Sequence, residues 1–150
     1  MVTQTQMSKV TMFQGLSEQV IDEFTSISKV VSFSKGDFIF KEAEPAKKIY
    51  FLLDGKISLR VNLTSKPESI TVSIINQSFQ GFGWSGIVSP FHYTASAKSE
   101  EDCRVIEFQG KEFIDVLSQH PEAGFIVMQR LAEIISNRLK NSRQALLKTL

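Results

Sequence analysis

The chain has 150 residues, with 17 Lys and Arg against 16 Asp and Glu, so its formal net charge is +1. This balance gives no general attraction to nucleic acid or to an anionic membrane. The single cysteine, Cys103, excludes a disulfide scaffold and a zinc site built from several cysteines. The longest apolar run, residues 49–53, is far shorter than the ~20 residues of a membrane-spanning helix. The first residues lack the apolar core of a signal peptide, so we expect one cytoplasmic domain over residues 1–150.

The N-terminal part should contain one short helix. Residues 1–12 are mainly polar, and we expect them to form a flexible flank. Ser17 can cap the first helix, because its hydroxyl can accept hydrogen bonds from the free amides of the first turn. Apolar side chains then recur at three- and four-residue spacing, as on one face of a helix. They are Val20, Ile21, Phe24 and Ile27.

The middle of the chain has the pattern of short strands separated by turns. The expected strands are residues 30–33, 37–40, 49–53, 56–61, 70–75, 94–98 and 103–108. Asp54-Gly55 favours a type I′ turn, so the strands on either side of it are expected to form a hairpin. Many short strands at near-regular spacing favour a β-sandwich or roll over a parallel sheet.

Helical periodicity returns at Lys111, and Pro121 is suited to open a long final helix over residues 122–150. Apolar and small residues in this helix alternate four and three apart, which is typical of a helix that pairs with another helix. We expect this seam to form a homodimer, and its residues are Met128, Ala132, Ile135, Leu139, Ser142 and Leu146. The residues expected to pack on the domain itself are Phe125, Ile126, Leu131 and Ile134.

Several motifs follow one another in a recognisable order. They are Phe13-Gln14-Gly15-Leu16-Ser17, the Gly36-Asp37 strand of residues 33–40, the acidic loop 41–46, the Asp54-Gly55 segment of residues 49–57, Gly83-Trp84-Ser85 and Tyr93-Thr94-Ala95. Over residues 13–150 they resemble the cyclic-nucleotide-binding domain of the cAMP receptor protein/fumarate-nitrate regulator (Crp/Fnr) family. The resemblance implies a mainly β fold with flanking helices: a double-stranded β-helix, or jelly roll, with a long C-terminal dimerisation helix.

In that family a phosphate-binding cassette holds the cyclic phosphate, and the resemblance puts this cassette between Gly83 and Tyr93. The family's glutamate, which accepts the ribose hydroxyl, is replaced by Trp84, whose indole can only donate. The family's arginine, which pairs with the phosphate, is replaced by Tyr93. The candidate ligand-pocket residues are Gly83, Trp84, Ser85, His92, Tyr93, Thr94 and Ala95.

The cassette has no Lys or Arg between Gly83 and Tyr93. A buried phosphate without a cation is costly, so the sequence predicts that cAMP and cGMP are not ordinary ligands. Trp84 and Phe91 can be interpreted as core residues or as the aromatic lining of a pocket for a less charged molecule.

We therefore interpret the chain as a stand-alone regulatory sensor that binds a small effector of unknown identity in the β-roll and signals through a helix-mediated dimer. One alternative is a transcription-regulator-like protein that binds cAMP or cGMP. Another is an interaction module whose pocket is empty or filled by Trp84 and its neighbours.

Other function classes are less well supported. The chain stops where the family continues into a DNA-binding domain, so specific DNA binding by this chain alone is not expected. The basic residues near its end are interpreted as a solvated helix face, and they are Arg138, Lys140, Arg143 and Lys148. His92 and His120 stand far apart, so no metal site or other cofactor is predicted. The sequence has no recognisable set of catalytic residues, and the chain is not expected to be an enzyme.

Overall fold

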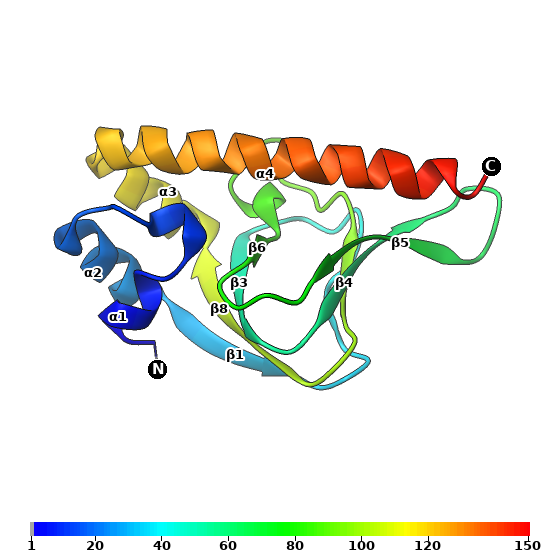
Figure 1. Cartoon of the computed structure of the whole chain (residues 1–150), viewed down its shortest axis with the longest axis horizontal. Coiled ribbons are helices and arrows are strands. Elements are labelled where there is room, and N and C mark those ends of the chain that lie inside the picture. Colours follow the sequence, from blue (N-terminus) through cyan, green and yellow to red (C-terminus); the bar gives the residue numbers. More distant parts are fainter. Residues whose placement is uncertain (1) are drawn as a thin grey trace.

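The computed structural model describes residues 2–150 as an eight-stranded jelly roll with helices gathered at one end and a long helix lying across it (Figure 1). The mainly β jelly roll expected from the sequence is thereby confirmed. In chain order the elements are α1 (Gln4–Met7), η1 (Thr11–Phe13), α2 (Glu18–Ile27), β1 (Lys29–Phe33), β2 (Phe38–Phe40), β3 (Lys48–Asp54), β4 (Ile57–Asn62), β5 (Ser69–Ile75), β6 (Gly81–Phe82), η2 (Trp84–Gly86), β7 (Ser96–Ser99), β8 (Cys103–Gln109), α3 (Gly110–Gln119) and α4 (Pro121–Leu147).

The strands form two antiparallel sheets, in the orders β1-β8-β3-β6 and β2-β7-β4-β5. The hairpin predicted at Asp54-Gly55 is wrong, because β3 pairs with β8 and β6 whereas β4 pairs with β5 and β7. Gly55 instead turns the chain from one sheet into the other, with φ +105°. A Cβ atom at Gly55 would lie 2.4 Å from the Cβ of Cys103. The Asp-Gly signal specifies a tight reversal, but it does not specify which sheet the next strand joins.

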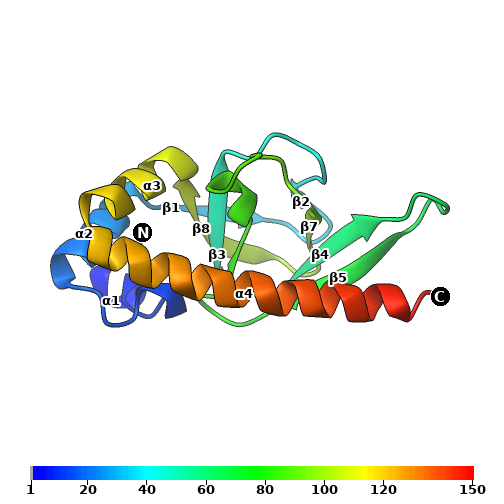
Figure 2. The ribbon, with the colours of Figure 1, turned by 90° about the horizontal axis from the view of Figure 1, so that it is seen from above.

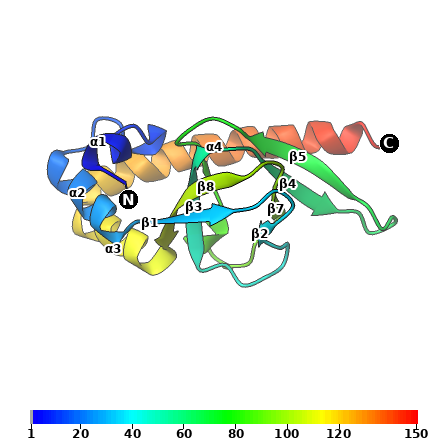
Figure 3. The same ribbon diagram turned by 90° about the horizontal axis from the view of Figure 1, so that it is seen from below.

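The helical end of the molecule is held by a core of aromatic side chains. Phe13 and Phe24 stack with ring centroids 4.3 Å apart, and Phe108 of β8 and Phe113 of α3 pack around them. All four side chains are fully buried. Seen from below, β1 leads from this helical end into the roll (Figure 3). Aromatic packing therefore fixes α2 and α3 to the sheet that contains β8.

The N-terminal segment does not form the flexible flank that the sequence predicts, at least over residues 2–12; Met1 lies outside the described residues. This segment contains α1 and η1, and Met7, Val10 and Met12 are fully buried. Their spacing follows no single helical or strand period, so only tertiary packing reveals them as core residues. The start of α2 is as expected, since Ser17 Oγ accepts a hydrogen bond of 3.3 Å from the Val20 amide.

Helix α4 has 27 residues and runs along the whole molecule (Figures 1 and 2). Its buried residues, Ala123, Val127 and Leu131, all lie in its first half. Phe125 is 69% exposed, so the expectation that it packs on the domain is wrong. The helical phase set by the buried residues turns Phe125 outward. Within residues 2–150, no helix combines the length and the hydropathy needed to cross a membrane.

Candidate functional site

A cavity of about 360 Å³ opens where the roll, the cassette and α4 meet. Three groups of residues form its walls. The roll contributes Phe40, Leu59, Val72 and Ser73; the cassette contributes residues at 83–85, 88–90 and 93–95; and α4 contributes Ile135, Arg138, Leu139 and Ser142. The volume lies within the range of about 300–1,000 Å³ that is usual for small-molecule sites.

Six of the seven predicted pocket residues line this cavity, and they are Gly83, Trp84, Ser85, Tyr93, Thr94 and Ala95. His92 does not, because its exposed side chain turns elsewhere and its Nδ1 lies 3.0 Å from the Pro90 carbonyl oxygen. His92 and Phe91 line a separate cavity beside the start of α3. Phe91 is 47% exposed, so its interpretation as a core residue is wrong.

Two glycines allow the cassette to pack closely on the roll. Gly83 has φ +82°, and a Cβ atom there would lie 3.1 Å from Cδ2 of Tyr50. A Cβ atom at Gly86 would lie 2.2 Å from the backbone oxygen of Lys48. The turn of η2 between these glycines is therefore held directly against β3.

Tyr93 occupies the position that the resemblance gives to the phosphate-binding arginine, and it acts differently. Its ring stacks on Phe40, with centroids 3.7 Å apart and planes 10° apart. Its hydroxyl donates a hydrogen bond of 2.8 Å to the Lys48 carbonyl. Burial raises the pKa of Tyr93 above its ordinary value, so the side chain stays neutral. Tyr93 thus forms a wall of the cavity and contributes no charge to it.

Trp84 combines the two roles that the sequence left open. It is only 7% exposed, belongs to the buried core and meets Phe51 edge-on, yet it also lines the cavity. Its Nε1 is buried without a hydrogen-bond partner. The Trp84 side chain forms part of the cavity wall and does not fill the 360 Å³ cavity.

The sequence reasoning missed Arg138 of α4. Its guanidinium lies 5.9 Å from the Trp84 ring and donates a hydrogen bond to the Gly81 carbonyl. Burial lowers the pKa of Arg138 to about 10, so the group is still charged at neutral pH. Its interpretation as part of a solvated basic face is wrong. The helical phase could have found it, because Arg138 follows Leu131 and Ile134 at the seven- and four-residue spacing of the inward face.

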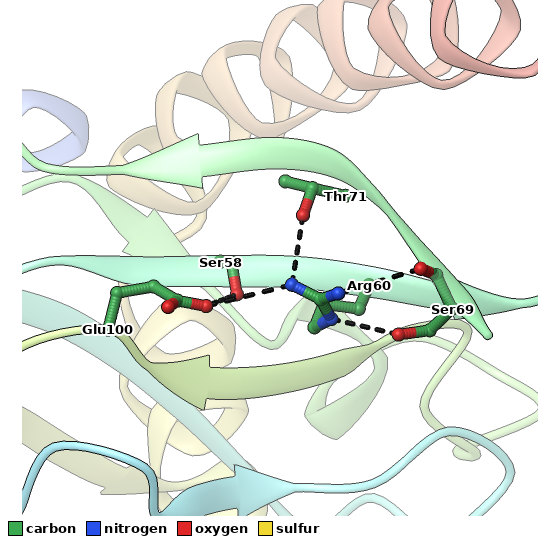
Figure 4. Close-up of polar contacts among 5 residues, drawn as sticks. All are labelled: Ser58, Arg60, Ser69, Thr71 and Glu100. Atoms are coloured by element: carbon green, nitrogen blue, oxygen red, sulfur yellow. Dashed lines mark hydrogen bonds and ion pairs between the residues drawn. The ribbon is translucent and has the colours of Figure 1, made fainter.

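A second half-buried arginine, Arg60, has several side-chain partners (Figure 4). Arg60 of β4 donates to Ser69 Oγ at 2.9 Å and to Thr71 Oγ1 at 3.1 Å. Its Nη1 also lies 3.7 Å from Glu100, which accepts a 2.6 Å hydrogen bond from Ser58. Arg60 therefore has an acidic partner and hydroxyl partners of its own, and it lines no part of the 360 Å³ cavity.

Among residues 2–150, no three His, Cys, Asp or Glu side chains are grouped so as to hold a metal ion. The two histidines are engaged separately: His120 contacts the Glu23 carboxylate, and His92 contacts the Pro90 carbonyl.

The three α4 residues Ile135, Leu139 and Ser142 belong both to the cavity wall and to the predicted dimer seam. Most of the seam is open to solvent, with Leu139 68% exposed and Met128, Ile135 and Leu146 also exposed. Because one face of the helix serves both features, any partner on the seam would sit beside the mouth of the cavity.

Known proteins resemble this chain over nearly its whole length. It is 23% identical over 140 residues to a CRP-like cAMP-activated global transcriptional regulator of Mycobacterium tuberculosis, covering 93% of this chain and 60% of the regulator. The fold matches a cyclic nucleotide-binding domain from Methylobacillus flagellatus with a TM-score of 0.79 at 15% identity, covering 97% of this chain and 81% of that one. It matches the sensor domain of the transcriptional regulator DNR from Pseudomonas aeruginosa with a TM-score of 0.76 at 19% identity, covering 91% of both chains.

A family match covers the centre of the chain. Residues 30–120, which make up more than half of the chain and run from within β1 to the end of α3 with the whole cassette, match the family described as the cyclic nucleotide-binding domain. The family is a regulatory one, related to Crp-type regulators. This chain belongs to the cyclic nucleotide-binding domain family.

Proposed function

We propose that the chain is a regulatory sensor module that binds a small effector in the 360 Å³ cavity and passes the binding event to α4. One observation carries the proposal: the cassette and α4 form the cavity together, so that an occupant would touch both. An effector that makes better contacts with one position of α4 than with another would shift the helix toward that position.

Cyclic nucleotides are the first effectors to consider. The relative from M. tuberculosis is described as cAMP-activated, although this chain spans only 60% of its length. The sequence argued against cAMP because the cassette lacks a cation. Arg138 weakens this objection, because it brings a positive charge to the same cavity from another element. A CRP-like cyclic nucleotide sensor is therefore a second candidate that this observation favours.

The signal would leave the domain through a homodimer. The exposed seam on α4 supports this part of the proposal, since most of its apolar side chains are exposed within residues 2–150. Because Ile135 and Leu139 belong to the seam and to the cavity wall, an effector could alter the dimer geometry directly.

Calorimetric titration with cAMP, cGMP, adenosine and guanosine tests the cavity. We expect at least one of these molecules to bind, and we expect Ser73→Phe, which fills the cavity from β5, to weaken that binding at least about tenfold. Ser26→Phe on the exposed face of α2 is the matched control and should bind as the wild type does. Binding that survives unchanged in Ser73→Phe would contradict the proposal, as would a folded wild-type protein that binds none of the four.

A further inference from the structure

We propose that Arg138 is an anion receptor carried by α4. In this proposal the helix supplies the positive charge that the cassette lacks, and the effector is a small oxyanion, either a phosphate ester or a carboxylate. The inference rests on the proposed function, because it concerns the same cavity, but it names the chemistry of the occupant and the residue that selects it.

The charges around the cavity support an anionic occupant. Among the described residues, Arg138 is the one charged side chain in the cavity wall. No carboxylate of residues 2–150 forms an ion pair with it; the acidic groups that do form ion pairs have other partners, as in Glu107 with Lys48 and Asp54 with Arg104. A half-buried cation that has lost part of its hydration and has no counter-ion is costly to the fold. An anion in the cavity would remove that cost.

The hydrogen-bonding groups that line the cavity also favour an anionic occupant. A guanidinium has five N–H donors, and the protein gives Arg138 one carbonyl acceptor, that of Gly81, and the Trp84 ring. Donors are therefore left over for an incoming acceptor. Hydroxyl groups also line the cavity, at Ser73, Ser85, Ser89, Thr94 and Ser142. Guanidinium and hydroxyl donors without any carboxylate suit an oxyanion and would repel a cationic ligand.

Other arginines of the chain differ from Arg138 in ways that make it distinctive. Arg60 already has Glu100 and two hydroxyl partners. Arg143, less than two turns further along α4, is exposed. Arg138 alone of these three is both turned into a cavity and without an acidic partner. Arg143 therefore provides a matched control on the same helix.

The hydrogen bond between Arg138 and the roll also links the occupant of the cavity to α4. In the structure its guanidinium holds the carbonyl of Gly81, at the start of β6 and two residues before the cassette glycine. An oxyanion would compete with this carbonyl for the same donors. Binding would thus exchange a contact between α4 and the roll for a contact between α4 and the effector.

The test follows the side-chain Nε–Hε signals of the arginines by NMR during titration with inorganic phosphate, acetate and cAMP. We expect the Arg138 signal to move and saturate with at least one of the anions, while the Arg143 signal stays in place. Phosphate and acetate distinguish a preference for phosphate esters from one for carboxylates. We also expect Arg138→Gln to weaken anion binding at least about tenfold, Arg138→Lys to restore part of it, and Arg143→Gln to change nothing. Thermal unfolding of each variant checks that it is folded.

The outcomes separate this inference from the function on which it rests. The inference is wrong if the Arg138 signal responds to none of the anions, or if folded Arg138→Gln binds them as the wild type does. If adenosine binds as tightly as cAMP and Ser73→Phe abolishes both, the cavity is an effector site but Arg138 does not select a charge. If Arg138 responds to phosphate while Ser73→Phe leaves every organic probe unaffected, the anion receptor stands and the proposed effector cavity falls.

Discussion

The two halves of α4 differ in how they contact the rest of the molecule. The first half, up to about Ile134, buries Ala123, Val127 and Leu131 against the helical end of the molecule. The second half buries no side chain fully and closes one side of the cavity. The same continuous helix is therefore anchored at one end and lies over the roll at the other (Figure 2).

An arginine in each half repeats this difference. In the first half, Arg130 donates to the carbonyls of Met12 and Gln14 at 2.9 and 2.8 Å and to that of Thr11 at 3.4 Å. In the second half, Arg138 has one carbonyl partner and faces open space. Arg130 holds three carbonyls of the N-terminal segment through its Nη1 group, whereas Arg138 holds one carbonyl of the roll and lines the cavity. Elements that respond to ligands are drawn from the less strongly held parts of a fold.

Truncating one leucine in each half should give the largest contrast. Leu131→Ala removes a buried side chain and should cost about 2–5 kcal/mol of unfolding free energy, as large-to-small core substitutions do. Leu139→Ala removes an exposed side chain and should change the stability of the monomer by less than about 0.5 kcal/mol. Urea denaturation measures both. Equal losses would mean that the second half is anchored as firmly as the first.

Removing the arginine of the anchored half should have the next largest effect. Arg130→Gln loses charge-assisted hydrogen bonds to backbone carbonyls and should destabilise the fold by about 1.5–3 kcal/mol. Amide exchange should show faster opening around η1. Arg138→Gln is the comparison, and we expect it to cost less, because it also removes a half-buried charge that has no counter-ion among the described residues. The comparison fails if Arg138→Gln is the more destabilising of the two.

A charge on the exposed seam should affect assembly rather than folding. Met128→Asp introduces a carboxylate into the predicted dimer contact without touching the cavity, and it should raise the dimer dissociation constant at least about tenfold, or about 1.4 kcal/mol. Sedimentation equilibrium measures the constant, and urea denaturation of the monomer should be nearly unchanged. An unaltered assembly state would place the dimer contact, if there is one, on another surface.

The spacing of apolar residues is enough to predict most strands and the long α4, and Ser17 marks the capped start of α2. These patterns could not show which sheet a strand joins, so Asp54-Gly55 was wrongly assigned to a hairpin. They also missed Met7 and Val10, whose burial depends on distant helices. Both errors concern contacts between segments that are far apart in the sequence.

The candidate site is likewise predicted only in part by the sequence. Gly83, Trp84 and Tyr93 could be assigned to the cavity because they lie within one continuous motif. For Arg138 the helical phase indicates only an inward-facing position, because the motif ends 45 residues earlier, at Tyr93, and α4 returns to the cavity only through the fold. The cassette itself carries no cation, and the cation of the cavity wall comes from α4.

The division of α4 into an anchored half and a cavity-closing half is tested most directly by hydrogen–deuterium exchange along the helix. The Met128→Asp variant is the suitable sample, so that a dimer contact does not add its own protection. We expect two blocks, with residues 121–134 exchanging slowly and residues 135–147 exchanging at least about tenfold faster, and with the second block slowed by a bound anion. A single block with uniform protection, unaffected by any ligand that binds, would contradict this division of α4.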